Sequence, residues 1–232
     1  MNRVIITAGG IGKRMGNEKI PKQFMKVNNI PIIIHTILHF EKCYDIDSIV
    51  IVCIESFVDE LKKMLLEYDI HKVVSVVSGG QSGQESIFIG LKELTKLYGL
   101  CDDIVLIHDS VRPLINNEII IRNIKSTKKY GSCITVNLMN ETLCKMCENI
   151  IETTVNRDDY VIGRAPQTFF LSDIYNNHLK ANEENKKFID SASLMNYYGF
   201  KLHTELGPIE NIKITTPVDI SFFKFYLQER KK

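Results

Sequence analysis

Residues 4–16 read VIITAGGIGKRMG, an apolar run that leads directly into a glycine loop. The run lacks the alternation of apolar and polar residues, so it predicts a strand that is buried on both faces. Similar apolar runs follow at 48–54, 72–77, 103–107 and 132–136, separated by helically spaced apolar residues at 31–40, 57–68, 84–98 and 117–130. Alternating strands and helices predict an α/β fold with a doubly wound, mostly parallel sheet.

The second half of the chain departs from this alternation. Residues 137–160 lack a long helical stripe and predict a protruding β-arm. Helices are expected over 171–181 and 191–198, a strand near 201–206, a strand-like run at 211–215 and a last helix from Pro217. We therefore expect one domain over residues 1–232, with the arm at 137–160 inserted within it.

Composition and charge restrict the class of protein. The chain holds 29 Lys+Arg against 28 Asp+Glu, and this balance argues against a general nucleic-acid binder, which usually carries a basic excess. The first apolar run is too short for a signal peptide, and no run approaches the roughly 18 apolar residues of a membrane span. We expect a cytoplasmic protein that binds neither nucleic acid nor membrane, with six reduced cysteines.

The glycine loop after the first strand only partly matches two known phosphate-binding motifs. Arg14 stands where a Walker A loop needs Ser or Thr. Gly10 and Gly12 match the start of a dinucleotide fingerprint, but its third glycine falls on Met15. Because Glu55 follows the second strand and could contact a ribose, a nicotinamide-dependent oxidoreductase stays open as an alternative.

Cations and a carboxylate lie where a nucleotide would bind. Lys13, Arg14 and Lys22 surround the amide-rich loop, and a triphosphate needs such cations. Residues 78–86, SGGQSGQES, form a second glycine-rich loop that opens a helix. Asp109 ends the fourth strand, which makes it a candidate magnesium ligand. Together these features predict a nucleotide–magnesium site at the carboxyl edge of the sheet.

Five segments carry a resemblance to a known family: TAGGIGKRMG (7–16), PKQF (21–24), HDSVRP (108–113), RAPQTF (164–169) and ENIKITTP (210–217). In this order the chain resembles the polyol-phosphate cytidylyltransferases. The family includes 2-C-methyl-D-erythritol 4-phosphate cytidylyltransferase of isoprenoid synthesis and ribitol-5-phosphate cytidylyltransferase of teichoic acid and capsule synthesis. The resemblance implies a Rossmann-like nucleotidyltransferase fold and transfer of CMP from CTP to a polyol phosphate with Mg²⁺. It also implies a homodimer in which each arm completes the partner's site.

The resemblance assigns roles to particular residues. The nucleotide would contact Ala8, Gly9, Gly10, Ile11, Gly12, Gly80, Ser86, Asp109 and Arg112. Asp109 would also bind magnesium, and Arg112 would support its loop. The catalytic residues would be Arg14, Lys22, Arg157 and Lys213. Thr142 and Arg157 from the partner's arm would hold the substrate phosphate together with Lys213. No general base is required, because the attacking phosphate oxygen is already anionic at neutral pH.

Departures from the family pattern leave the polyol open. Many relatives carry an arginine where this chain has Gly83, so a contact is lost or is supplied elsewhere, with Gln84 as the candidate. Ala165 replaces the threonine of the usual Thr-Pro-Gln. Ribitol 5-phosphate is favoured slightly over 2-C-methyl-D-erythritol 4-phosphate, and a non-catalytic nucleotide-binding protein stays a further alternative. His108 is expected to be structural, and Asp190 either caps a helix or approaches the substrate.

Overall fold

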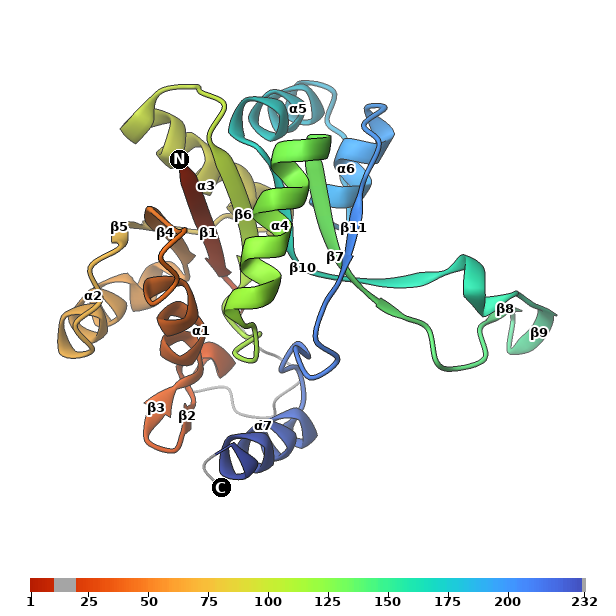
Figure 1. The fold of residues 1–232 in the computed structure, drawn as a ribbon, viewed down its shortest axis with the longest axis horizontal. Coiled ribbons are helices and arrows are strands. Elements are labelled where there is room, and N and C mark those ends of the chain that lie inside the picture. Colours follow the sequence, from red (N-terminus) through yellow and green to blue (C-terminus); the bar gives the residue numbers. More distant parts are fainter. Residues whose placement is uncertain (11–19, 231–232) are drawn as a thin grey trace.

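A computed structural model describes residues 1–10 and 20–230. Its centre is a seven-stranded sheet in the order β11-β7-β10-β6-β1-β4-β5 (Figure 1). These strands are β1 (Asn2–Ala8), β4 (Ser48–Cys53), β5 (Val73–Ser78), β6 (Ile104–Asp109), β7 (Ser132–Leu138), β10 (Val161–Phe170) and β11 (Thr204–Leu206). The paired strands are parallel except where β10 pairs with β6 and β7. The predicted α/β class with a mostly parallel sheet is confirmed.

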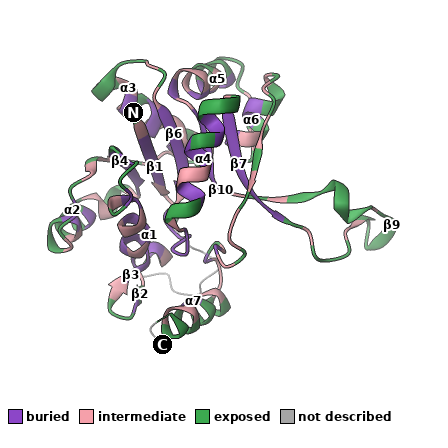
Figure 2. Cartoon of the chain, in the orientation of Figure 1, coloured by how far each residue is buried: buried purple, intermediate pink, exposed green. Residues whose placement is uncertain are grey.

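Helices cover both faces of the sheet, because successive side chains of each strand point to opposite faces. On β1, Val4 and Ile6 pack into one apolar cluster and Ile5 into the other. The first cluster includes α1 (Ile32–Glu41), α2 (Val58–Glu67) and α4 (Asn117–Tyr130). The second includes α3 (Gly83–Tyr98), α5 (Leu171–Glu183) and α6 (Ser191–Tyr197). Figure 2 shows the buried strands between these two layers. β5 lies at the edge of the sheet and has no fully buried residue. Its apolar run was therefore wrong as an indication of a strand buried on both faces.

The residues at 137–160 form the predicted arm. β8 (Cys144–Cys147) and β9 (Ile150–Thr154) pair with each other in a two-stranded sheet, and a short 3₁₀ helix, η4 (Arg157–Asp159), follows. Glu148 and Asn149 have positive φ angles of 45° and 69°, as a two-residue hairpin turn requires. The arm projects away from the sheet and is largely exposed (Figures 1 and 2).

The sequence missed one strand of the sheet and wrongly indicated another. β10 was not predicted, although it lies in the middle of the sheet. Residues 211–215 do not form the expected strand: they run as an irregular segment in which Ile214 N donates to the carbonyl oxygen of Val111 (2.9 Å). This segment leads into α7 (Pro217–Glu229), which packs Phe223 against a small third apolar cluster.

Four shorter elements complete the described part of the chain: η2 (Lys22–Phe24), β2 (Lys26–Val27), β3 (Ile30–Pro31) and η3 (Glu55–Phe57). Of these, η2 contributes to the site described below, because it follows the first glycine loop. No helix among the described residues is both long and apolar enough to cross a bilayer.

Candidate active site

One cavity lies at the carboxyl ends of β1 and β6, where ligands bind in open α/β sheets. Its volume is about 430 Å³, within the usual range for small-molecule sites. The lining residues are Thr7, Gly9, Gly10, Lys22, Gln23, Gly80, Gln81, Ser82, Gly83, Ser86, Asp109, Ser110, Val111, Lys213 and Thr215. Both glycine-rich loops that the sequence singled out therefore meet at one cavity.

The first glycine loop is held by a buried glutamine. Gln23 Nε2 donates to the carbonyl oxygens of Ala8 (2.8 Å) and Gly10 (3.1 Å). Both carbonyl oxygens therefore accept a hydrogen bond from within the protein. Gln23 belongs to the quoted segment PKQF, but the sequence alone did not give its side chain a role. Ala8 itself is buried and does not line the cavity.

The second glycine loop is fixed by the first turn of α3. Ser82 caps this helix by accepting from Glu85 N (3.1 Å), and Ser86 Oγ accepts from Gly80 N (3.2 Å). A Cβ on Gly79 would lie 3.1 Å from Ser86 Oγ, so the small residue permits close approach of loop and helix. The helix N-terminus, with its positive dipole end, faces the cavity together with the loop amides.

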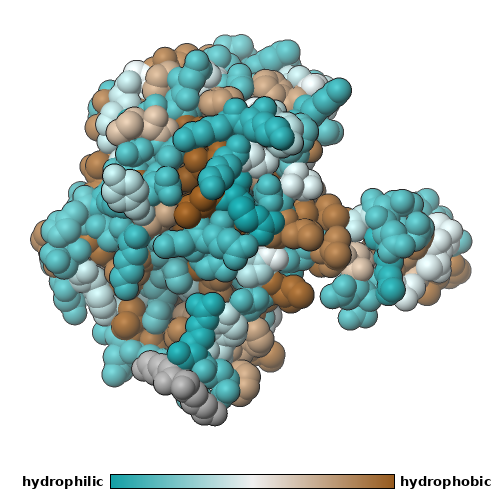
Figure 3. Space-filling view, in the orientation of Figure 1, coloured by the Kyte–Doolittle hydropathy of each residue, from teal (hydrophilic) through white to brown (hydrophobic). Residues whose placement is uncertain are grey.

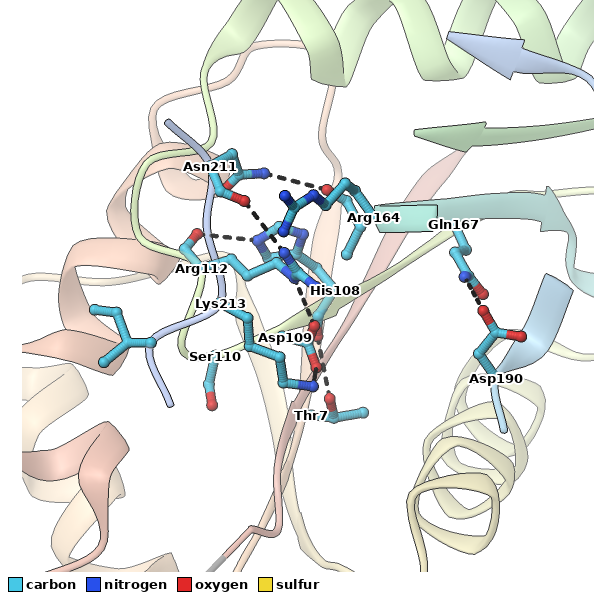
Figure 4. A network of polar contacts seen from close by, with 12 residues as sticks. Thr7, His108, Asp109, Ser110, Arg112, Arg164, Gln167, Asp190, Asn211 and Lys213 are labelled. Atoms are coloured by element: carbon cyan, nitrogen blue, oxygen red, sulfur yellow. Dashed lines mark hydrogen bonds and ion pairs between the residues drawn. The ribbon is translucent and has the colours of Figure 1, made fainter. Parts of the chain in front are cut away.

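A carboxylate held between two cations lies beside the cavity (Figure 4). Lys213 Nζ donates to Asp109 Oδ1 (2.8 Å), and Arg112 Nε donates to Asp109 Oδ2 (2.7 Å). Burial alone would raise the pKa of the Asp109 carboxyl, but Lys213 and Arg112 outweigh it and hold that pKa well below its usual range. Asp109 is therefore an anion at any physiological pH.

The surroundings of Asp109 carry surplus positive charge. Arg112 Nη1 also donates to the carbonyl oxygen of Asn211 (3.2 Å). Near Arg112, Arg164 donates from Nε to Asn137 Oδ1 (2.9 Å), and burial and the Arg112 charge both lower the pKa of its guanidinium. No salt bridge joins Arg164 to a carboxylate within the described residues. Such a cluster favours an anionic ligand.

The structure brings some predicted residues together and leaves others apart. Lys22 Nζ donates to the carbonyl oxygen of Ile214 (3.0 Å), which ties it to the segment that carries Lys213. Thr142 and Arg157 lie on the arm, and neither lines the cavity of its own chain. Arg157 instead donates to the carbonyl oxygen of Asn140 (3.0 Å) rather than pairing with its acidic neighbours. Ile11, Gly12, Lys13 and Arg14 lie outside the described residues.

Three expectations at the edge of the site have clear outcomes. Gln84 does not face the cavity: its side chain bonds the carbonyl oxygen of Lys186 (3.0 Å) and the amide of Phe188 (2.8 Å), so it does not replace the missing arginine contact. Asp190 caps α6, and its Oδ2 accepts from Gln167 Nε2 (2.7 Å; Figure 4). His108 is structural as expected: its buried ring packs against Phe40, and burial lowers its pKa to about 4.

The glycine loops, the strand-end carboxylate and the surplus cations define an α/β protein of the nucleotidyltransferase class. Comparison with known proteins specifies the family. The family model described as IspD, 2-C-methyl-D-erythritol 4-phosphate cytidylyltransferase, matches residues 2–229. The chain belongs to this family of polyol-phosphate cytidylyltransferases.

Individual relatives agree with this assignment. The chain is 45% identical over 226 residues to ribitol-5-phosphate cytidylyltransferase of Vibrio parahaemolyticus, covering 97% of this chain and 94% of the relative. It is 37% identical over 220 residues to 2-C-methyl-D-erythritol 4-phosphate cytidylyltransferase of Clostridium botulinum, covering 94% of each. The crystal structure of 4-diphosphocytidyl-2C-methyl-D-erythritol synthase from Anaerococcus prevotii superposes with a TM-score of 0.82 at 27% identity, covering 98% of both chains. The predicted cytidylyltransferase is confirmed over the oxidoreductase and non-catalytic alternatives.

Proposed function

We propose that the protein transfers CMP from CTP to ribitol 5-phosphate, giving CDP-ribitol and pyrophosphate. The observation that carries the reaction is the cavity in which two glycine loops face the Asp109–Lys213 pair. An oxygen of the acceptor phosphate attacks the α-phosphorus of CTP in line. As the new P–O bond forms, the bond to the bridging oxygen breaks and its electron pair leaves with pyrophosphate.

The residues of the chain would act by positioning and by neutralising charge. Gly9, Gly10, Ile11, Gly12, Gly80 and Ser86 would hold the nucleotide, with Ala8 supporting the first loop. Lys22 and Arg14 would stabilise the charge that accumulates in the transition state. Lys213 would hold the acceptor phosphate. Charge neutralisation is the main requirement, because a dianion must approach a triphosphate.

The donor set of the site suits a magnesium ion held together with phosphates. No group of three or more His, Cys, Asp or Glu side chains that could hold a metal occurs in the described ranges. Mg²⁺ usually binds through one or two carboxylates and completes its shell with water and substrate phosphates, so the single ionised Asp109 fits. Asp109 is the residue that would hold Mg²⁺, which would neutralise phosphate charge. Arg112 would keep the Asp109 carboxylate aimed at the cavity through its 2.7 Å contact.

A second copy of the chain would complete the site. Thr142 and Arg157 are exposed on an arm that does not line the cavity of its own chain. An isolated two-stranded hairpin is marginally stable in water, and this one exposes Met146, Ile150 and Ile151. An arm exchange in a homodimer would cover the hairpin and would bring Thr142 and Arg157 to the partner's Lys213. The single domain over 1–232 and the cytoplasmic location stay predictions.

Ribitol 5-phosphate is the proposed acceptor because the chain is more similar to the ribitol-type relatives, at 45% and 42% identity, than to the methylerythritol-type relative at 37%. The test is pyrophosphate release with CTP and Mg²⁺, run side by side on ribitol 5-phosphate and 2-C-methyl-D-erythritol 4-phosphate. Turnover of ribitol 5-phosphate alone is the expected result. Turnover of the methylerythritol substrate alone would overturn the choice of polyol and leave the reaction standing. No turnover of either, with CTP still bound, would overturn both.

A further inference from the structure

A second cavity shares the loop before α3 with the active-site cavity. Its volume is about 240 Å³, against about 430 Å³ for the active-site cavity. The lining residues are Ser82, Gln84, Glu85, Phe88, His178, Ala181, Asn182, Asn185, Lys186 and Lys187. Ser82 lines both cavities, so one loop forms a wall of each. Among the described residues, none of those predicted for the reaction lines this second cavity.

A buried histidine without hydrogen bonds lies at the second cavity. His178 is 2% exposed, and neither Nδ1 nor Nε2 has a hydrogen-bond partner among the described residues. Burial lowers the pKa of the ring to about 4, so the ring is neutral at pH 7. A neutral imidazole has one donor and one acceptor nitrogen, and leaving both unpaired is costly. A hydroxyl group can serve either nitrogen, because it both donates and accepts.

The rim of the cavity is held in place by the end of α5. Asn185 has a positive φ angle of 53°, and Lys186 N donates to the carbonyl oxygen of Ala181 (2.8 Å), so the chain turns back over the helix end. Gln84 then bonds the carbonyl oxygen of Lys186 and the amide of Phe188. The segment that carries the two lysines is therefore fixed against α3.

Size and charge restrict the ligand. Ligand cavities usually span roughly 300–1,000 Å³, so this smaller cavity suits a metabolite smaller than a nucleotide. The one lining carboxylate, Glu85, accepts from Gln81 N (2.8 Å). Lys186 pairs with Glu184 (3.2 Å), whereas no salt bridge reaches Lys187 within residues 1–10 and 20–230. An anionic group is therefore expected at Lys187, and a phosphate monoester, with about −1.5 to −2 charges at neutral pH, gains most from it.

We propose that the second cavity binds a small phosphate monoester that carries hydroxyl groups, with a hydroxyl at His178 and the phosphate at Lys187. The site uses neither Lys213 nor Asp109, so it does not depend on the roles given to them above. A ligand there would contact the loop that also lines the active-site cavity, which gives the site a direct route to the reaction. The acceptor polyol phosphate and other phosphorylated sugars share this chemistry.

The test follows the ring nitrogens of His178 by long-range ¹H–¹⁵N NMR of the labelled chain. Their signals are identified as those absent from His178→Gln. Ribitol 5-phosphate or ribose 5-phosphate should shift them saturably, and the tighter of the two identifies the source as the acceptor class or as another phosphorylated sugar. Ribitol, which lacks the phosphate, and inorganic phosphate, which lacks the hydroxyl groups, should each bind at least about tenfold more weakly. Equal binding of inorganic phosphate would overturn the ligand class.

A substitution at the rim tests the site without changing the buried ring. Lys187→Glu should raise the dissociation constant at least about tenfold, because it replaces an attraction for the phosphate by a repulsion. Lys125→Glu is the matched control, because Lys125 is exposed on α4, on the other face of the sheet. Figure 3 shows that the surface over α4 is largely hydrophilic, so this charge reversal should leave the dissociation constant unchanged.

Lys213→Met separates the second cavity from the active site. This variant lacks the ammonium group that the proposed function assigns to the acceptor phosphate, and the shifts of the His178 signals should persist in it. Their loss in Lys213→Met would assign them to the active site and overturn the second site. Equal effects of Lys187→Glu and Lys125→Glu, or no shift with millimolar ribitol 5-phosphate and ribose 5-phosphate, would also overturn it. None of these results would contradict the proposed reaction.

Discussion

Replacing Lys213 by methionine should lower the reaction rate strongly and the folding free energy only slightly. The substitution keeps the unbranched stem and removes the ammonium group that lies 2.8 Å from Asp109 Oδ1. The Lys213 side chain is 42% exposed, so water screens the pair, and its loss should cost less than about 1 kcal/mol of folding free energy. Asp109 keeps its contact with Arg112 and stays ionised, so no unpaired carboxylate is left behind.

The effect on the reaction should be much larger. If Lys213 holds the acceptor phosphate, its removal takes away one preorganised charge, which typically costs about 10²–10³ in rate, or about 2.7–4 kcal/mol. Initial rates of pyrophosphate release at saturating CTP, with the acceptor varied, measure this loss, and thermal unfolding measures stability. Lys62→Met is the matched control, because Lys62 pairs with Asp59 (3.9 Å) on α2, outside the site. A Lys213→Met rate within about threefold of the native rate, or a rate loss equalled by Lys62→Met, would refute the assigned role.

Three further substitutions test other parts of the structure. Lys22→Ala should lower turnover by about 10²–10³ and leave the melting temperature nearly unchanged, and near-native turnover would contradict its catalytic role. His178→Leu tests a buried ring that has no hydrogen-bond partner among the described residues, and burial lowers the pKa of this ring to about 4. The His178 imidazole takes up a proton near pH 6.5 in the unfolded chain but not in the folded chain, so the free energy of unfolding should fall by about 2 kcal/mol from pH 8 to pH 5 because of this residue. Urea unfolding at the two pH values should show that His178→Leu removes this fall. An unchanged fall would contradict the reasoning. Gly90→Ala would place a Cβ 2.8 Å from Ile5 Cγ2 and 3.0 Å from Val52 Cγ2. Urea unfolding should therefore show a free energy of unfolding lower by about 1–3 kcal/mol. An unchanged midpoint of the urea transition would show that α3 can shift freely.

The sequence missed β10 for a physical reason. Proline lacks the N–H that a central strand needs, so Pro166 argues against a strand at 161–170. In the structure the pairing of β10 with β7 shifts between Gly163 and Gln167, and Pro166 lies within that irregularity. The strand therefore tolerates a proline in the middle of the sheet. Periodicity cannot reveal such a shift, because it depends on the neighbouring strand.

Residues 211–215 keep the burial pattern of a strand without the backbone pairing of one. Ile214 is buried, whereas its neighbour Lys213 is exposed. Within residues 1–10 and 20–230 no strand pairs with this segment, so it stays irregular, and the carbonyl oxygen of Ile214 accepts from Lys22 instead. The Lys213–Asp109 contact joins residues 104 positions apart, so the assignment of Lys213 came from the resemblance and not from spacing.

The two strands that carry the arm are connected to the site of the same chain. β7 leads into the arm and β10 leads out of it, and the Arg164–Asn137 bond joins the two at the root of the arm. Asn137 is itself anchored through its Nδ2 to the carbonyl oxygen of Gly207 (2.8 Å). Arg164 lies near Arg112, which holds Asp109, so one guanidinium both braces the arm and adds to the charge of the site. Because β10 also pairs with β6, the strand that ends in Asp109, a displacement of the arm root has a direct structural route to the carboxylate. In an arm-exchanged dimer this connection would make each site depend on both chains, through the arm it receives and through the arm it extends.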